Sequence, residues 1–270
     1  MSSLREALRH TQSDSRGGFI PFVTAGDPDL ATSLSIVLKL AELGADVIEL
    51  GVPFSDPMAD GPTIQLSSQR ALDKGTTLND VLSLASEFRK QSSVPLVLFS
   101  YFNPIMRFGL DDFSKTAADA GIDGVLLTDV IEDEAAAIST RLAKQNIDLI
   151  SLVAPTTTDK RLETICENAR GFIYAVSRAG VTGARETTSS EAKKLVLRAR
   201  QFTDLPIAVG FGISTASQIT DVWRYADAAV VGSALVAEIE KVKKPVDAVS
   251  QVERFVGQLL PQFAKTGSEN

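Results

Sequence analysis

The chain has 270 residues, of which 44% are hydrophobic and 23% are charged, as in an ordinary globular protein with a sizeable core. Its net charge of −7 and the lack of a lysine or arginine cluster argue against a nucleic-acid partner. No apolar run approaches the roughly 18 residues of a membrane span, and the N-terminus lacks a signal-peptide core. We therefore expect a cytoplasmic protein that has neither a membrane nor a nucleic-acid partner.

Cysteine and histidine each occur once. Cys166 cannot form a disulfide framework within the chain, which fits a reducing compartment, and we expect it to be a small core residue. His10 lies in a predicted N-terminal helix. A single histidine in that place excludes a histidine general base in the body of the chain and disfavours a zinc site. We expect no metal.

Short runs rich in valine and isoleucine alternate with helical stretches along the chain. Such runs are typical of parallel strands that are covered on both faces. The predicted N-caps of the helices between them are Asp27, Thr76, Asp159, Ser189 and Ser214. The predicted strands, in chain order, are Phe19–Thr24, Asp46–Gly51, Pro95–Tyr101, Gly124–Thr128, Asp148–Val153, Gly171–Val176, Pro206–Gly210 and Ala228–Val231.

Eight strands that alternate with helices predict one parallel (β/α)8 TIM barrel domain over residues 1–270, with an extra N-terminal helix. An open doubly wound sheet is the alternative, but Thr24-Ala25-Gly26-Asp27 after the first strand is not its glycine fingerprint. Two connections, Pro53–Pro62 and Ser177–Ser189, are longer than a barrel needs. We expect them to be mobile loops at the end of the barrel that holds the site. Residues from about 265 to 270 are expected to be frayed.

The second predicted strand carries one acid among apolar residues. Because side chains alternate along a strand, Glu49 shares a face with Val47 and Gly51. Burying a carboxylate there is costly unless the group is paired or has a chemical task. Asp60 supplies a second acid from the loop that follows. One carboxylate at a rigid strand end and one on a loop that could move over it form an acid–base arrangement.

Glycines follow the last two predicted strands. Gly210-Phe211-Gly212-Ile213-Ser214 follows the seventh, and Gly232-Ser233 follows the eighth and opens a helix. Glycine lets the backbone approach a ligand, and a helix N-terminus presents free N–H groups. Barrels with such loops after these two strands commonly bind phosphate there. We predict a phosphate site, with glycines that only form tight turns as the alternative.

Lysine is absent from every predicted strand. A Schiff-base aldolase needs a buried lysine on a barrel strand, so this mechanism is disfavoured. The missing histidine cluster disfavours a metal-dependent aldolase as well. Carbon–carbon cleavage in this chain would have to rest on carboxylates alone. Tyr174 is predicted to face inward near them, and Arg178 could neutralise acids of the first long loop or could be solvated.

The stretch from Gly51 to Gln65, GVPFSDPMADGPTIQ, resembles the signature of the tryptophan synthase alpha chain family. The similarity covers nearly the whole chain, from Ile20–Pro28 to Gly232-Ser233, and the loop after the sixth strand resembles the family's second mobile loop. The resemblance implies retro-aldol cleavage of indole-3-glycerol phosphate to indole and glyceraldehyde 3-phosphate. It implies that Glu49 is the acid–base at indole C3 and at the side-chain hydroxyl. Asp60 would hold the indole N–H and stabilise the positive nitrogen.

The same resemblance assigns the remaining site residues. Apart from the resemblance, the opposite charges of the two long loops and the hydroxyl of Thr182 predict a closure in which Thr182 hydrogen-bonds Asp60. Two positions depart from the family's pattern: Thr128 replaces a small apolar residue on the ring side, and Ile131 replaces a proline, which leaves substrate fit and loop rigidity open. The matched positions are Phe22, Tyr101, Tyr174 and Phe211 at the pocket, Leu126 as an apolar wall, and Gly183, Gly212, Ile213, Gly232 and Ser233 at the phosphate.

The family's alpha chain works with a beta chain that uses pyridoxal phosphate to join indole to serine. The resemblance therefore implies an α2β2 heterotetramer and no cofactor in this chain, with Asp56, Pro57 and Asn103 on the communicating surface. The charge of Arg178 gives it a possible part in loop closure. Two alternatives stay open: a free-standing indole-3-glycerol phosphate lyase, and an activator subunit with little activity of its own. Intact Glu49 and Asp60 disfavour the second. Indole production with and without a beta chain would separate them.

Overall fold

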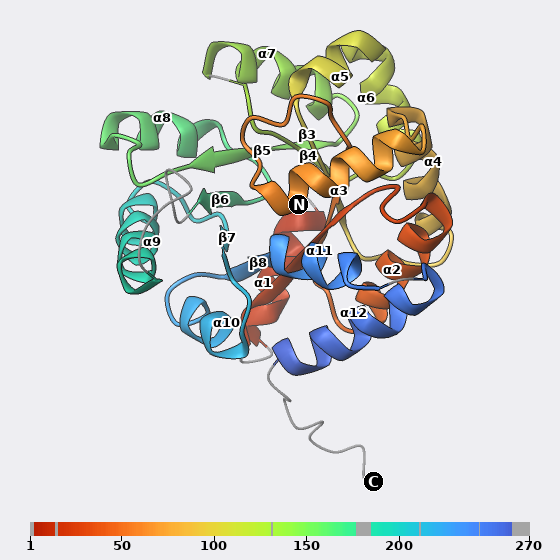
Figure 1. Cartoon of the computed structure of the whole chain (residues 1–270). Helices are drawn as coiled ribbons and strands as arrows, with labels where there is room; N and C mark the ends of the chain where they lie inside the picture. The colour runs from red at the N-terminus through yellow and green to blue at the C-terminus, as the bar shows by residue number, and fades with distance from the viewer. Residues whose placement is uncertain are drawn as a thin grey trace, which may run out of the picture.

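The computed structural model of the chain describes residues 3–13, 16–130, 132–176, 185–210, 212–242 and 244–260. Its eight strands pair in parallel with their sequence neighbours, and β8 pairs with β1 to close a barrel (Figure 1). The predicted TIM barrel is confirmed. The strands are β1 (Gly18–Thr24), β2 (Ile48–Gly51), β3 (Leu96–Ser100), β4 (Gly124–Leu127), β5 (Asp148–Val153), β6 (Ile173–Val176), β7 (Ile207–Gly210) and β8 (Ala228–Val231).

Several strand ends differ from the predicted ones by one or two residues. β3 and β7 begin directly after Pro95 and Pro206, because proline has no N–H to donate to a neighbouring strand. The proline carbonyls still accept: Ile48 N donates to Pro95 O and Ile173 N donates to Pro206 O, at 2.9 Å each. Both prolines therefore act as the first acceptors of their ladders.

The helices form a ring around the barrel (Figure 1). Their apolar faces and the outward side chains of the strands make one large buried cluster. None of the helices in the described part of the chain is long and apolar enough to cross a membrane. The helices are α1 (Ser3–Ser13), α2 (Leu30–Glu42), α3 (Pro62–Asp73), α4 (Leu78–Arg89), α5 (Phe102–Phe108), α6 (Leu110–Asp119), α7 (Glu132–Ala143), α8 (Asp159–Asn168), α9 (Arg185–Ala199), α10 (Ala216–Val222), α11 (Ser233–Glu240) and α12 (Val246–Leu259).

The predicted N-caps are wrong by one or more residues. Ser189 lies inside α9, and Asp27 forms an ion pair with Arg70 instead of capping a helix. Each predicted cap has another Ser, Thr or Asp next to it or two residues away, so composition alone did not decide which side chain reaches the free amides. The side chains that accept hydrogen bonds from the first amides of α2, α4, α8 and α10 are those of Asp29, Thr77, Thr158 and Thr215.

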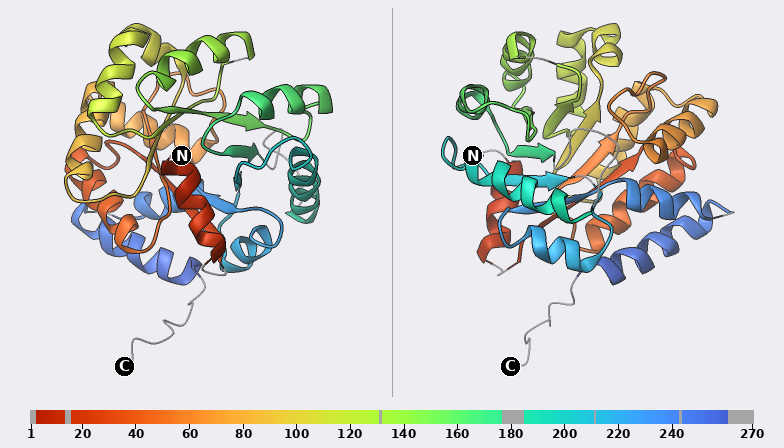
Figure 2. Two further views of the ribbon diagram at one scale, coloured as in Figure 1. Left: turned by 180° about the vertical axis from the view of Figure 1, so that it is seen from behind. Right: turned by 60° about the vertical axis from the view of Figure 1, so that its left-hand side comes forward.

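Alternate strand residues fill the barrel interior, and α1 closes one end of it (Figure 2, left). Leu4 and Leu8 of α1 are fully buried in the interior cluster. They lie against the first residues of two strands, Gly124 of β4 and Gly18 of β1. The expected N-terminal helix therefore covers the amino ends of the strands. A ligand has to enter at the opposite end, where the strands finish.

Candidate active site

Glu49 lies on β2 and points into the barrel. It is paired in register with Phe22 of β1 and Val97 of β3, and only 1% of its surface is exposed. Its Oε1 atom has no hydrogen-bond partner among the described residues. Burial raises the pKa of Glu49 from 4.5 to about 8, because desolvation disfavours the charged form. At neutral pH this carboxyl therefore holds its proton.

Asp60 lies on the connection between β2 and α3, and Tyr101 holds it. Tyr101 Oη donates a hydrogen bond of 3.1 Å to Asp60 Oδ2 and accepts one of 2.9 Å from Ala59 N. Burial raises the pKa of Asp60 to about 6, and the hydrogen bond from Tyr101 opposes this rise. Burial and the charge of Asp60 raise the pKa of Tyr101 to about 12, so the phenol stays a donor.

The two carboxyls differ in protonation because their surroundings differ. Glu49 Oε1 is buried and has no donor among the described residues, whereas Asp60 is less deeply buried and accepts from a phenol. Near pH 7 the first is mostly protonated and the second mostly ionised. Two carboxyls whose pKa values are pushed apart are typical of an acid and a charge stabiliser in one site.

Aromatic side chains surround these carboxyls. The rings of Phe22 and Phe99 meet edge to face with centroids 5.3 Å apart. A Cβ at Gly51 would lie 2.5 Å from the Phe22 ring, so glycine leaves the room that this ring occupies. Leu126 is fully buried on the inward face of β4, as expected for an apolar wall.

Tyr174 faces inward from β6, as predicted. Burial, and then the negative charges of Glu49 and Asp60, raise the pKa of Tyr174 well above its ordinary value. The phenol is therefore neutral and close enough to both carboxyls to feel their charges. It belongs to the interior cluster and is 8% exposed.

The loops after β7 and β8 have the features of a phosphate site. Gly212 has a φ of +74°, a conformation that side chains rarely adopt, and nothing lies within 4 Å of the place of its Cβ. Gly232 and Ser233 form the beginning of α11, whose first amides have no partner inside the helix. Ile213 differs from the expectation in one respect: its side chain is buried in the outer cluster, so only its backbone can face a phosphate.

Polar contacts anchor α3, the helix that follows Asp60. Thr24 Oγ1 at the end of β1 lies 2.6 Å from Ser67 Oγ on α3. Arg70, one turn further on, donates to both carboxylate oxygens of Asp27 at 2.9 and 2.7 Å. These contacts hold α3 against the end of β1 and the residues that follow it.

Several residues predicted for the site lie outside the described residues. Phe211, Arg178, Thr182 and Gly183 are outside them, as is Ile131. The second long loop was expected to reach Ser189, but α9 begins at Arg185. The mobility of both long loops stays a prediction.

The residues expected at the partner surface are accessible. Asp56 and Asn103 are exposed and Pro57 is half-buried. Two large apolar side chains lie near them in sequence, Met58 with 91% and Met106 with 57% of its surface exposed. The connections that carry these residues follow neighbouring strands, β2 and β3, so they lie at the same edge of the barrel mouth.

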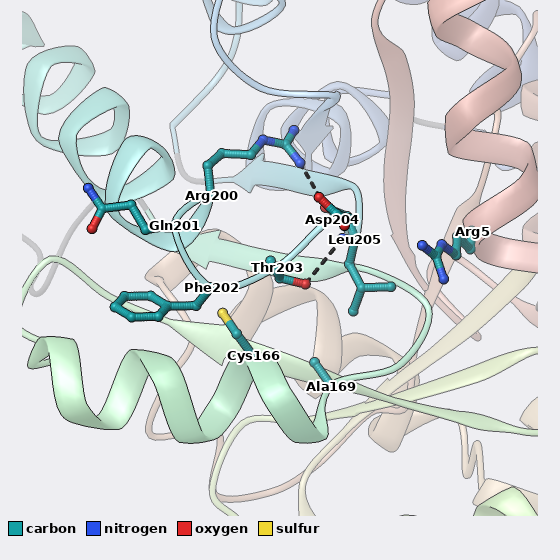
Figure 3. Close-up of a pocket in the computed structure, with 9 residues that line it drawn as sticks. All are labelled: Arg5, Cys166, Ala169, Arg200, Gln201, Phe202, Thr203, Asp204 and Leu205. Carbon is teal, nitrogen blue, oxygen red and sulfur yellow. Dashed lines mark hydrogen bonds between the residues drawn. The ribbon is translucent and has the colours of Figure 1, made fainter.

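A hollow of about 460 Å³ lies at the other end of the barrel (Figure 3). It is formed by Arg5 of α1, Cys166 of α8 and the connection from Arg200 to Leu205. Arg200 is already engaged, since it pairs with Asp227 and donates to Leu205 O at 2.8 Å. Burial raises the pKa of the Cys166 thiol to about 11, which fits the expected core residue. This hollow is separate from the carboxyls.

No group of three or more His, Cys, Asp or Glu side chains in the described part of the chain is arranged to hold a metal. The eight strands, all of which are described, contain no lysine. Among the described residues, the site offers two carboxyls, two phenols, the hydroxyl of Thr128 and backbone amides as its chemical groups.

Comparisons with known proteins agree with this geometry. Residues 8–263 match the family model described as tryptophan synthase alpha chain. The chain belongs to the tryptophan synthase alpha chain family. It is 46% identical over 259 residues to the alpha chain of Citrifermentans bemidjiense, covering 96% of this chain and 97% of the relative. It is also 46% identical to the alpha chain of Acidiphilium cryptum, covering 92% and 89%.

Solved structures of family members have the same fold. The alpha subunit of Legionella pneumophila matches with a TM-score of 0.87 at 34% identity, over 96% of this chain and 97% of the other. Tryptophan synthase from M. tuberculosis, in an aminoacrylate-bound form, matches with a TM-score of 0.86 at 32% identity, over 96% and 98%. The expected enzyme class is confirmed: the chain is an alpha subunit, a lyase for indole-3-glycerol phosphate that needs no cofactor of its own and has a beta-chain partner.

The structure also shows contacts that the sequence interpretation missed. Tyr101 was expected at the pocket but not as the donor to Asp60, and Phe99 was not expected there at all. Phe99 and Tyr101 lie two and four positions after Val97, which faces inward on β3. The alternation of side chains along the strand could therefore have predicted that both face inward. The contact of α3 with β1 through Thr24 and Ser67 has no such signal.

Proposed function

We propose that Glu49 is the acid and base of the cleavage and that Asp60 stabilises the charge formed in it. Protonated Glu49 gives its proton to indole C3, which makes an indolenine with a positive nitrogen. The Asp60 carboxylate accepts a hydrogen bond from that N–H. The Glu49 carboxylate then takes the proton of the side-chain hydroxyl. The bond between C3 and the side-chain carbon that carried the hydroxyl breaks. Its electrons return to the ring and neutralise the nitrogen, and indole and an aldehyde form.

The observation that carries this proposal is the unlike protonation of the two carboxyls. A general acid has to start protonated, and a pKa of about 8 leaves Glu49 protonated at neutral pH. A charge stabiliser has to be ionised, and Tyr101 helps to keep Asp60 so. The difference between the two pKa values supports this division of roles.

We further propose how the substrate lies. The ring would stack among Phe22, Leu126, Tyr101 and Tyr174, while the phosphate would contact backbone amides at Gly212 and at Gly232-Ser233. The matched positions Phe211, Gly183 and Ile213 belong to the same proposal. The inward faces of β1, β3, β4 and β6 and the start of α11 support this placement.

Two substitutions test the division of roles. Glu49→Gln and Asp60→Asn each keep the shape of the side chain. The first removes the group that gives and takes the proton, and the second removes the negative charge. Turnover of indole-3-glycerol phosphate should fall by about 10²-fold or more for Glu49→Gln, since proton transfer by a positioned group contributes roughly 10²–10⁴-fold. Near-normal turnover of either variant would end the assignment for that residue.

We also propose that indole passes to a beta chain that holds pyridoxal phosphate, within an α2β2 heterotetramer. Asp56, Pro57 and Asn103 would contact that partner. The exposed Met58 and Met106 beside them support an interface at this edge. Loop closure, with Arg178 near the acids and Thr182 bound to Asp60, stays a proposal, as do the single domain over residues 1–270 and the cytoplasmic location.

An assay of indole release with and without a beta chain separates the alternatives. A dependent alpha subunit should be nearly silent alone and strongly activated by the partner. High activity without a partner would instead support a free-standing lyase. Little activity under either condition, with activation of the beta reaction, would support an activator subunit.

A further inference from the structure

Thr128 carries a buried hydroxyl that the proposed reaction does not use. The residue follows the end of β4 and has the inward parity of Leu126, two positions earlier. Its Oγ1 atom is buried and has no hydrogen-bond partner among the described residues. A buried hydroxyl without a partner is unfavourable, so this atom points to an interaction that another arrangement of the site completes.

The neighbour of Thr128 on the next strand is Tyr101. β3 and β4 are in register up to Ser100 and Leu127, and Thr128 N continues the ladder by donating to Ser100 O at 3.3 Å. The following positions, Tyr101 and Thr128, therefore lie side by side on the inward face, at a strand spacing of roughly 4.8 Å. The two strand ends are also tied together just beyond this pair, where Phe102 N donates to Asp129 Oδ1 at 2.8 Å.

The phenol of Tyr101 has one acceptor position left. Its oxygen donates to Asp60 and accepts from Ala59 N, and a hydroxyl oxygen can accept a second hydrogen bond. The Thr128 hydroxyl is close enough to lower the pKa of Tyr101, against the larger effect of burial. Thr128 Oγ1 has no hydrogen-bond partner among the described residues by distance and angle, yet its side chain acts on the pKa of Tyr101 as a hydrogen-bond donor does.

We propose that Thr128 is a positioning residue, whose hydroxyl donates to Tyr101 Oη and thereby holds the phenol on the Asp60 carboxylate. The chain of hydrogen bonds would run from Thr128 to Tyr101 to Asp60. Each bond in such a chain polarises the next, so the first hydroxyl strengthens the last bond without touching the substrate. This inference rests on the proposed role of Asp60.

A bound ligand is the other group that this hydroxyl could serve. The hydroxyl would then donate directly to a polar atom of the ligand, and its effect would not depend on the Tyr101 phenol. The phenol is the better assignment because Tyr101 lies next to Thr128 in the strand register, because its oxygen has a free acceptor position, and because the Thr128 side chain lowers its pKa as a hydrogen-bond donor does. All three features are present without a ligand.

A double-mutant cycle separates these two roles. Thr128→Val removes the hydroxyl with little change of shape, Thr128→Ser keeps it, and Tyr101→Phe removes the phenol oxygen. We expect Thr128→Val to lower kcat for indole-3-glycerol phosphate by about fivefold, the size of one neutral hydrogen bond, and Thr128→Ser to restore most of it. In the Tyr101→Phe background, Thr128→Val should have no further effect. An equal loss in both backgrounds would overturn the proposal.

A second measurement does not depend on catalysis. The Asp60 carboxyl can be titrated by carbon NMR, with its signal assigned through Asp60→Asn. Thr128→Val should raise the pKa of Asp60, since the hydrogen bond from Tyr101 lowers it. Among the described residues, Tyr101 and Tyr174 are the titratable groups that interact with Asp60, and they are the same in both proteins.

The outcomes of the two proposals can be told apart. Normal turnover of Asp60→Asn would remove the proposed role of Asp60, whereas the NMR shift would still report the contact from Thr128. An unchanged pKa of Asp60 in folded Thr128→Val would overturn the positioning role even if Asp60 proved essential. Should valine destabilise the protein, Thr128→Ala tests the same hydroxyl.

Discussion

The backbone of Gly210 lies directly against the phenol of Tyr174. A Cβ built at Gly210 would lie 2.1 Å from Tyr174 Oη and 2.6 Å from Cζ. The two residues come from neighbouring strands, β7 and β6. The missing side chain therefore provides the space in which this phenol stands near Glu49 and Asp60.

Adding a methyl group at this position should disturb the site without unfolding the barrel. Gly210→Ala forces Tyr174 to move, and a displacement of about 1 Å at a site can cost about 10²-fold in rate. Replacing Tyr174 by leucine in the same chain should recover part of the loss, because the clash is with the ring. The measurement is kcat/KM for indole-3-glycerol phosphate in the three proteins.

Gly257→Ala is the matched control for that substitution. Gly257 lies in α12, and nothing lies within 4 Å of the place of its Cβ. Turnover should be unchanged, and the free energy of unfolding should rise by about 1 kcal/mol, as for glycine to alanine inside a helix. A similar loss of activity in both variants would show that the effect of Gly210→Ala is not local.

The pH dependence of kcat/KM should be bell-shaped. Activity should rise through about pH 6 as Asp60 ionises, and fall above about pH 8 as Glu49 loses its proton. Tyr101→Phe should move the lower limb to higher pH, because the lost hydrogen bond lowers the pKa of Asp60. A lower limb that stays in place in Tyr101→Phe would contradict the assignment of that limb to Asp60.

Glu49 should also make the protein less stable as the pH rises. Its folded pKa of about 8 lies above the ordinary value of 4.5, so the folded state binds more protons than the unfolded state between these values. The free energy of unfolding therefore falls progressively from about pH 4.5 to pH 8 because of Glu49, by at most about 1.4 kcal/mol per pH unit. Glu49→Gln should remove this slope, and urea unfolding at several pH values measures it. Parallel stability curves for the two proteins would show that Glu49 is not desolvated.

The proposed phosphate contact can be tested at Gly212. Its φ of +74° strains a β-branched residue, whereas asparagine tolerates this region. Gly212→Val should raise KM for indole-3-glycerol phosphate by about tenfold or more, the effect of losing one charge-assisted hydrogen bond of about 1.5 kcal/mol. Gly212→Asn should be less affected. Equal affinity of the parent for the substrate and for dephosphorylated indole-glycerol would argue against a phosphate site.

The sequence determined the architecture because its signals are local and repeated. Eight short Val- and Ile-rich runs alternate with helical stretches, and each run corresponds to a strand of the closed barrel. The alternation of side chains placed Glu49 and Tyr174 on the inward face, and the resemblance made Leu126 an apolar wall, which is buried in the interior cluster. Strand ends and N-caps were less certain, because neighbouring residues compete for them and only the folded backbone selects one.

Only the tertiary structure decided how the groups of the site act on one another. Tyr101 and Asp60 are distant in sequence, and their hydrogen bond exists because β3 and the connection after β2 meet at the barrel mouth. The pKa of Glu49 depends on how completely the surrounding strands exclude water, which no spacing in the chain contains. The same holds for the position of the Thr128 hydroxyl beside Tyr101 and for the space that Gly210 leaves. Residue type and alternation are properties of the chain, whereas burial and contact between distant segments arise only when the barrel closes.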